Sequence, residues 1–510
     1  MLKSGTRLGA WLLLAALAGG AAPQPSGPAR AARQWRLRHE RAILDEFIQL
    51  LSVPNVAGDL ADMQRNAALI RRMLEKRGVR TRLLEVPGAP AAVFGELATP
   101  GARRTVLLYA HYDGQPVEPA QWAGGDPFRP ELRTGPLEAG GKAIPLPEPG
   151  RRFDPEWRLY ARSAGDDKAP IVALVAALDA LGAAGVRPTS NIKVFFDGEE
   201  EAGSPHLEQI IRQHRELLAA DAWIFCDGPV HQNRRQQVVF GARGTAGLQV
   251  TVYGPRRELH SGHYGNWAPN PALMLAHLLA SLRDEDGRTL VRDFYEGIEP
   301  LSETEKRALA QAPDFDAELK KELWLARTEG GGRRLDELIN LPALNVRGLA
   351  SAGVGAQSRN VIPASATASI EVRLVKGMDH RVTVDRVIEH IRRQGYYVTE
   401  AEPDASVRLA HPKVARVTRR AGYNAVRTSM DLEISRRVID AIEAAHGPVI
   451  RLPTLGGSLP IFPIAEILKA PAIVVPIANH DNNQHGHNEN IRLQNLWDGI
   501  ETLAALLAMR

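Results

Sequence analysis

Short apolar runs separated by helical patterns are the feature that most limits the fold of this chain. The runs occupy residues 93–97, 106–110, 192–196, 222–226 and 472–477, and most are bounded by Gly, Pro, Asn or Asp. Runs of this length predict strands that are buried on both faces. Residues 171–184, which follow Pro170, are apolar nearly all round and predict a buried helix. The alternation predicts an α/β fold with a doubly wound, mostly parallel sheet covered by helices on both faces.

The middle of the chain has a different pattern. Leu248, Val250 and Val252 alternate with polar residues, and residues 370–374 do the same, which predicts strands that bury one face only. A chain of 510 residues has the length of two or three domains. We therefore predict a catalytic domain formed by residues 38–240 and 421–510, with an α+β domain, residues 241–420, inserted into it.

The first residues have the layout of a secretory signal peptide. Lys3 and Arg7 precede an apolar run at 8–18 and small residues at 19–22. The run is shorter than a membrane-spanning helix, so we expect no stable membrane span, with an uncleaved anchor as the alternative. We predict a signal peptide at 1–22, a linker at 23–37, and a periplasmic or secreted protein.

Charge and cysteine content exclude two further possibilities. The formal net charge of +4 is spread along the chain without clusters of basic and aromatic residues, so nucleic acid is not an expected partner. The single cysteine, Cys226, excludes an internal disulfide. Because it ends an apolar run, we predict a buried, unreactive thiol.

Acidic and histidine residues follow several of the predicted strands, and Asp166 and Asp167 stand in the loop just before the predicted buried helix. In open α/β sheets, ligands bind beyond the carboxyl ends of the strands. Carboxylates gathered at such an edge repel one another unless cations neutralise them. Imidazole and carboxylate ligands suit zinc, with manganese or cobalt as alternatives, and two ions need a bridging carboxylate. The residues concerned are His111, Asp113, Asp166, Asp167, Glu200, Glu201, Asp227 and His485.

The same residues carry a resemblance that spans nearly the whole chain after the N-terminal segment. The sequence resembles the di-zinc family of carnosinases, glutamate carboxypeptidases, aminoacylases, acetylornithine deacetylases and succinyl-diaminopimelate desuccinylases. The segments that match, in order, are His111-Tyr112-Asp113-Gly114-Gln115-Pro116, Asp166-Asp167-Lys168, Glu200-Glu201-Ala202-Gly203-Ser204, Asp227, His260-Ser261-Gly262, and His485 ahead of Asn488-Glu489.

The resemblance implies a role for each metal ligand. Asp166 bridges two zinc ions, His111 and Asp227 complete one site, and Glu201 and His485 complete the other. Asp113 lies two residues from His111 on the same face of an extended segment, where it can accept the free ring N–H of that histidine.

Glu200 is the expected general base. It takes a proton from the attacking water and passes it to the leaving nitrogen. The neighbouring Glu199 fits no role, and we expect it to be solvated.

Three further features follow from the resemblance. His260, in the insert, stabilises the oxyanion, in many relatives by reaching across a dimer interface, so a homodimer through the inserted domain is expected. Arg373 has a guanidinium fork that matches a substrate carboxylate. The backbone of Gly457 and Ser458 can approach the same carboxylate closely.

The chain also departs from the family pattern. Ala161, Ser163, Ala169 and Asn266 replace common glycines, which affects loop geometry and leaves the metal ligands intact. An additional segment at 134–152 is rich in Gly and Pro, and it could shape the mouth of the pocket.

These observations predict a di-zinc hydrolase that cleaves the amide bond of a dipeptide or small peptide with a free carboxylate. Two alternatives stay open. The first is an N-acyl amino acid deacylase, which uses the same chemistry on a different substrate. The second is a binding protein that keeps the fold without catalysis, which would be expected to have lost part of the site.

Overall fold

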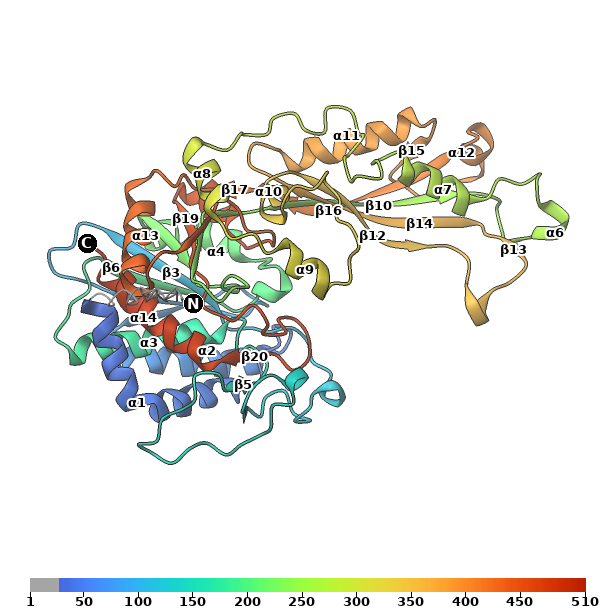
Figure 1. The fold of residues 1–510 in the computed structure, drawn as a ribbon. Coiled ribbons are helices and arrows are strands. Elements are labelled where there is room, and N and C mark those ends of the chain that lie inside the picture. The colour runs from blue at the N-terminus through green and yellow to red at the C-terminus, as the bar shows by residue number, and fades with distance from the viewer. Residues whose placement is uncertain (1–26) are drawn as a thin grey trace, which may run out of the picture.

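An eight-stranded sheet, here called the central sheet, forms the core of the structure, a computed structural model that describes residues 27–510 (Figure 1). Strands β6, β3, β7 and β19 lie side by side and run parallel, whereas β1 and β2 pair antiparallel at one edge. In spatial order the strands are β1 (Arg80–Leu84), β2 (Ala92–Leu97), β6 (Asn191–Asp197), β3 (Thr105–His111), β7 (Ala222–Phe225), β19 (Ala472–Val474), β8 (Gln237–Val239) and β18 (Ile450–Leu452).

Helices cover both faces of the central sheet, because its middle strands are apolar on both sides. One apolar cluster joins the first face to α1 (Gly27–Leu51), α2 (Leu60–Glu75), α3 (Lys168–Ala183), α13 (Glu433–His446) and α14 (Leu493–Leu507). A second cluster joins the other face to α4 (Leu207–Gln213), α5 (Arg215–Leu218) and the π-helix Ile464–Leu468. All five predicted apolar runs contribute strands to this sheet, and the predicted α/β fold with a mostly parallel sheet is confirmed.

Helix α1 corrects the prediction of a linker at 23–37. The helix begins at Gly27, and its small residues Ala29 and Ala32 are fully buried. Arg33 donates two hydrogen bonds to Glu501 of α14, at 2.7 and 2.8 Å. Alanines and arginines that resemble a linker in sequence therefore form the first turns of a packed helix. The remainder of the predicted linker and the predicted signal peptide lie outside the described residues.

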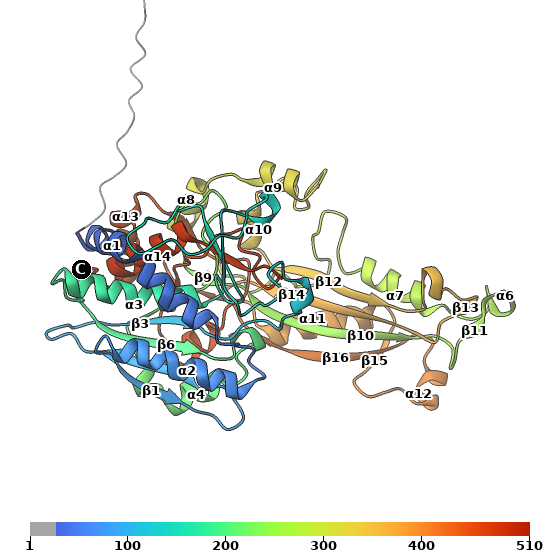
Figure 2. The same cartoon turned by 90° about the horizontal axis from the view of Figure 1, so that it is seen from below.

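A second sheet of five strands, here called the lid sheet, extends away from the central sheet (Figures 1 and 2). Helices α7 (Pro271–Ala280) and α11 (His380–Arg393) pack on one face through an apolar cluster. The other face carries the alternate polar residues. In spatial order the strands are β12 (Ala343–Ala350), β14 (Ser365–Leu374), β10 (Gly244–Tyr253), β16 (Val414–Tyr423) and β15 (Tyr397–Thr399). These strands fall within or next to the predicted insert, whose boundaries at 241 and 420 stay predictions.

Short elements complete the chain. A three-stranded sheet joins β20 (Asn490–Arg492), β5 (Arg158–Tyr160) and β4 (Glu131–Arg133), so it brings the end of the chain to the loop before α3. None of the helices within residues 27–510 has the length and apolar character needed to cross a bilayer. The other short elements are β9 (Gly241–Ala242), β11 (Leu259–His260), β13 (Val361–Ile362), β17 (Val426–Arg427), α6 (Ser261–Tyr264), α8 (Glu303–Gln311), α9 (Asp316–Glu322), α10 (Leu335–Ile339), α12 (Ala405–Ala410), and the 3-10 turns Pro119–Gln121, Leu137–Ala139, Glu200–Ala202 and Gly355–Gln357.

Candidate metal centre and active site

The carboxyl ends of three parallel strands bring the predicted ligands together. His111 is the last residue of β3, and the turn after the neighbouring strand β6 carries Glu200 and Glu201. Asp227 follows β7 on the other side of β3. Asp166 reaches the same edge from the loop that precedes α3. The sheet topology thus gathers side chains that are far apart in sequence.

The Asp166 carboxylate lies between the two histidines. Its Oδ1 is 2.9 Å from His111 Nε2, and its Oδ2 is 3.3 Å from His485 Nε2. His111 Nε2 is also 3.8 Å from Asp227 Oδ2, and His485 Nε2 is 3.2 Å from Glu201 Oε2. Asp166 thus contacts both histidines, and a carboxylate in that position can bridge a pair of cations.

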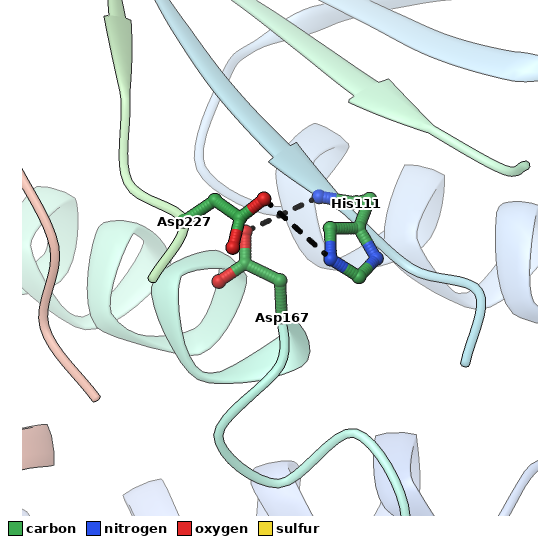
Figure 3. A group of neighbouring side chains, drawn as sticks. All are labelled: His111, Asp167 and Asp227. Atoms are coloured by element: carbon green, nitrogen blue, oxygen red, sulfur yellow. Dashed lines mark hydrogen bonds and ion pairs between the residues drawn. The ribbon is translucent and has the colours of Figure 1, made fainter. Parts of the chain in front are cut away.

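Asp167 is a neighbour that sequence reasoning left without a role. Together with His111 and Asp227 it forms one of the two groups whose ligand atoms converge, and the other group is Asp166, Glu201 and His485. Figure 3 shows that the Asp167 and Asp227 carboxylates approach the His111 residue from the same side. Asp167 Oδ2 accepts the His111 backbone N–H at 3.3 Å. Its Oδ1 is buried and has no hydrogen-bond partner within residues 27–510, which suits an oxygen that faces a cation.

The pKa values of the cluster reflect this concentration of negative charge. Burial raises the pKa of Asp227 to about 7, and repulsion from Asp166 adds to the shift. Burial and Asp166 likewise raise the pKa of Glu201 to about 7. Burial raises the pKa of Glu200 well above its usual range, which His111 opposes and Asp227 reinforces. Asp166 is also buried, but hydrogen bonds from His111 and His485 hold its pKa well below the usual range. The donor set therefore fits cations, which would remove this repulsion.

Two polar residues orient the ligands. Asp113 accepts the backbone N–H groups of Glu200 and Glu201 at 3.0 and 2.9 Å, and its Oδ1 lies 3.3 Å from His111 Nδ1. It therefore links the histidine to the turn that carries both glutamates. Gln115, in the motif that begins at His111, donates to Glu201 Oε2 at 2.8 Å. Sequence reasoning assigned no role to Gln115, although it stands within a quoted motif.

Glu489 fixes the loop that carries Asp166. Its carboxylate is fully buried and accepts the backbone N–H groups of Ser163, Gly165 and Asp166, each at 2.9 Å. Arg162 Nη1 donates a fourth bond at 2.8 Å, and its Nη2 donates to the Gly486 carbonyl at 2.9 Å. Burial raises the pKa of Glu489, and Arg162 opposes that rise. This carboxylate joins the Asp166 loop to the loop of His485, a role that the sequence did not reveal.

A pocket of about 930 Å³ opens between the ligand cluster and the polar face of the lid sheet. The predicted substrate-binding residues Arg373, Gly457 and Ser458 line it, together with the candidate ligands Asp166 and His485. Arg373 donates to Ser458 Oγ and, through Nε, to Glu371 at 3.2 Å. A carboxylate on a small substrate can therefore approach Arg373 while an amide bond faces the ligand cluster.

His260 is not brought to the pocket. It is exposed in β11, which pairs with β13 at the end of the lid farthest from the central sheet (Figures 1 and 2). Its Nδ1 accepts the Gly262 N–H at 3.1 Å, and its ring lies 4.4 Å from that of His263. His260 is therefore not among the residues that line the pocket of its own chain.

Two expectations are wrong. Glu199 is buried rather than solvated, and its carboxylate accepts the backbone N–H of His206 at 2.8 Å. The segment 134–152 contributes no residue to the lining of the pocket. It packs instead on the catalytic side, where Ile144 contacts the apolar core and Arg41 donates to the Pro147 carbonyl at 2.7 Å. Both errors arise because a turn-rich or charged segment in sequence gives no sign of its packing partners.

Cys226 is buried, and burial raises the pKa of its thiol well above the usual range. The prediction of a buried, unreactive cysteine therefore agrees with its environment.

The α/β fold and the paired ligand groups define a metal-dependent hydrolase. A family model described as peptidase family M20/M25/M40 matches residues 107–509, and the chain belongs to this family. It is therefore an enzyme of the metallopeptidase class. Family membership and the two ligand groups confirm the prediction of two zinc ions, and they confirm the resemblance drawn from the motifs.

The chain is similar to several characterised proteins over most of its length. It is 24% identical over 480 residues to the Cys-Gly metallodipeptidase of Schizosaccharomyces pombe, covering 90% of this chain and 94% of that one. It is 25% identical over 490 residues to the human Beta-Ala-His dipeptidase, covering 90% and 89%. The solved structure of an M20 family metallo-carboxypeptidase from Sulfolobus solfataricus has a TM-score of 0.73 at 24% identity and covers 91% of this chain and 98% of that one.

These comparisons also correct the prediction of a periplasmic or secreted protein. The relatives include the Cys-Gly metallodipeptidases of three yeasts, which give export no support. The prediction depended on an apolar run and its flanking residues at 1–22, a composition that by itself does not define an export signal.

Proposed function

We propose that this enzyme hydrolyses the amide bond of dipeptides that carry a free carboxylate. The observation that carries the proposal is the pocket itself. Asp166, which lies between two histidines, lines this pocket together with Arg373. The similarity to dipeptidases over most of the chain supports the same substrate class. His111 and Asp227 would hold one zinc ion, Glu201 and His485 would hold the other, and Asp166 would be the ligand between them.

The residues of the chain divide the chemistry among them. When bound, a pair of zinc ions supplies Lewis acidity that polarises the scissile carbonyl and acidifies the attacking water. Glu200 accepts the proton of that water at its carboxylate and donates it to the leaving nitrogen. Its raised pKa, which results from burial and neighbouring carboxylates, suits a group that must both accept and release a proton. Asp113 keeps the Glu200 backbone in place through the N–H bond at 3.0 Å.

Arg373 orients the substrate. Its guanidinium faces the pocket and pairs with the substrate carboxylate, which places the neighbouring amide bond toward Asp166 and Glu200. Ser458, which contacts Arg373, and the adjacent Gly457 complete this carboxylate site. A substrate without a carboxylate loses this orientation, so selectivity for small charged substrates follows.

A homodimer through the lid completes the proposal. Strand β12 is an edge strand of the lid sheet, and its residues from Asn345 onward are exposed. Val346 and Leu349 on β12 and Leu273 on α7 are exposed at 43%, 62% and 62%. An exposed apolar edge strand is a template for pairing with a second chain. In such a dimer His260 can reach the pocket of the other copy and stabilise the oxyanion.

The test is hydrolysis of a panel of dipeptides and N-acyl amino acids by the zinc-loaded protein, with a chelator control. We expect chelator-sensitive cleavage of dipeptides. Glu200→Gln is expected to lower kcat by roughly 10²–10⁴-fold with zinc content unchanged. The control is Glu208→Gln, because Glu208 is an exposed residue of α4 that pairs with Arg212. Cleavage of N-acyl amino acids alone would indicate the deacylase, and near-normal turnover by Glu200→Gln would refute the assigned base.

A further inference from the structure

The wall of the pocket that the lid sheet provides carries more positive charge than the proposed function uses. Arg347, Arg373 and Arg420 all line the pocket, and the same wall contributes one acidic side chain, Glu371. The opposite wall is formed by the acidic ligand cluster. The pocket is therefore polarised, with arginines on the lid and carboxylates on the catalytic side.

Two of the three arginines share a partner. Glu371 lies 3.1 Å from Arg347 Nη1 and 3.2 Å from Arg373 Nε, so both of its carboxylate oxygens are engaged. The side chain of Arg420 has no hydrogen bond or ion pair with any residue in the range 27–510. The positive charge of the Arg420 guanidinium is thus not paired with an acidic side chain of the protein.

The strand register directs Arg420 toward the substrate space. Gly247 of β10 pairs with Arg420 of β16 on one side and with Glu371 of β14 on the other. A Cβ atom at Gly247 would lie 3.6 Å from Arg420 Cδ and 3.7 Å from its Cβ. The aliphatic part of Arg420 therefore lies against the bare backbone of Gly247. A larger residue at 247 would compete for this space.

The other arginines of β16 differ from Arg420. Arg419, the preceding residue, is 2.7 Å from Asp385 of α11, on the opposite face of the sheet. Arg416 pairs with Glu402. The arginine without an acidic partner is thus the one of these three that lines the pocket.

We propose that Arg420 is a specificity residue that selects dipeptides whose C-terminal residue has an acidic side chain. The inference rests on the proposed function, in which Arg373 binds the α-carboxylate of that residue. Arg373 on β14 lies opposite Thr245 and Arg420 on β16 lies opposite Gly247, so the two residues are about 9.5 Å apart across β10 and about 7 Å apart along it. Two arginine side chains at this separation can pair with the two carboxylates of one aspartate or glutamate.

Charge complementarity favours this placement of the second carboxylate. An acidic side chain turned toward the catalytic wall would meet the carboxylates of Asp166, Glu200 and Asp227. The same side chain turned toward the lid meets Arg420. A neutral side chain of equal size forms no ion pair with Arg420. The difference in kcat/KM between a substrate with an acidic side chain and one with a neutral side chain therefore measures this contact.

The experiment compares Ala-Glu with its isosteric neutral counterpart Ala-Gln. We expect the zinc-loaded protein to cleave Ala-Glu with a kcat/KM about tenfold higher, which corresponds to about 1.4 kcal/mol. The difference is expected in KM, because the contact is equally present in the ground state and the transition state. Arg420→Gln should bring the ratio of Ala-Glu to Ala-Gln cleavage close to one. Arg419→Gln is the matched control and should keep the wild-type ratio.

The outcomes separate the inference from the function on which it rests. Equal cleavage of Ala-Glu and Ala-Gln by the wild-type protein, or a preference that survives in Arg420→Gln, would overturn the role of Arg420 and leave the dipeptidase intact. A protein that cleaves neither substrate refutes both. A melting temperature equal to that of the wild type shows that Arg420→Gln is folded. Salt provides a second measurement, since a preference that depends on an exposed ion pair must weaken at high ionic strength.

Discussion

Glu489→Gln tests whether a single buried carboxylate holds the candidate metal centre together. In the wild type, Glu489 Oε1 accepts from Gly165 and Asp166, and Oε2 accepts from Ser163 and Arg162. Glutamine keeps one oxygen and replaces the other by an NH₂ group that cannot accept. Two of the four donors therefore lose their partner whichever way the amide turns.

The expected loss of stability in this variant follows from the burial of the Arg162 and Glu489 side chains. The side chains of Arg162 and Glu489 are 2% and 1% exposed. Removing one partner of a buried ion pair costs about 3–5 kcal/mol, because the remaining charge stays buried without compensation. We expect the free energy of unfolding to fall by this amount. Because the same bonds orient the Asp166 loop, we also expect zinc affinity to fall by roughly 10–100-fold.

Two measurements follow this variant: denaturant unfolding of the zinc-free protein, and zinc affinity by competition with a chromophoric chelator. Glu443→Gln is the control, since Glu443 makes a half-exposed pair with Arg451, and its loss should cost below about 1 kcal/mol. A large loss of stability with unchanged zinc affinity would refute the positioning role of Glu489. A change in stability as small as that of the control would refute the reasoning on burial.

Further predictions concern pH, metal removal and thiol chemistry. Because burial raises the pKa values of Asp227 and Glu201 to about 7 in the folded, zinc-free protein, the contribution of these two groups to stability should fall as the pH rises from about 4 to 7. Zinc should restore the lost stability, and thermal melts with and without chelator measure both effects. Burial and Glu501 raise the pKa of Asp498 to about 7, so Asp498→Asn should stabilise the protein at pH 8 and have little effect at pH 4. We expect a gain of about 1–2 kcal/mol after allowance for its partial exposure, and a melting temperature that does not rise at pH 8 would contradict this. Cys226 should react with a maleimide only after unfolding, and rapid labelling of the native protein would show that the site is accessible.

The central sheet could be predicted from sequence because its middle strands are apolar on both faces. Strands β3 and β6 lie where the runs at 106–110 and 192–196 predicted them. Strand β1 was not predicted, because its residues alternate between exposed and half-buried positions until Leu84 and resemble a surface segment. Strands β5 and β20 have three residues each, too few for a periodic pattern, and they form because residues 490–492 return to pair with residues 158–160.

His111, Glu201 and Asp227 could be predicted because each follows a strand of the central sheet, and strand ends at one sheet edge converge. Asp166 and His485 stand in loops and were identified from the matching motifs. The residues that hold these ligands in position could not be predicted from the sequence. Glu489 makes its bonds with residues more than 320 positions away, so neither spacing nor periodicity indicates them. Glu199 stands beside two functional glutamates and looks equally polar in sequence. Only the hydrogen bond from the His206 backbone N–H shows that Glu199 stabilises the local structure.

Strand β5 can pair with β20 only after nearly the whole chain has been synthesised. His111 and Asp166 leave the ribosome more than 300 residues before His485 and Glu489, and domains usually fold in the order in which they emerge. Until the last segment arrives, the Asp166 loop lacks its anchor and the second group of ligands lacks its histidine. On the proposed assignment of the ligands, both ions can be held stably only after the segment with His485 and Glu489 has been synthesised.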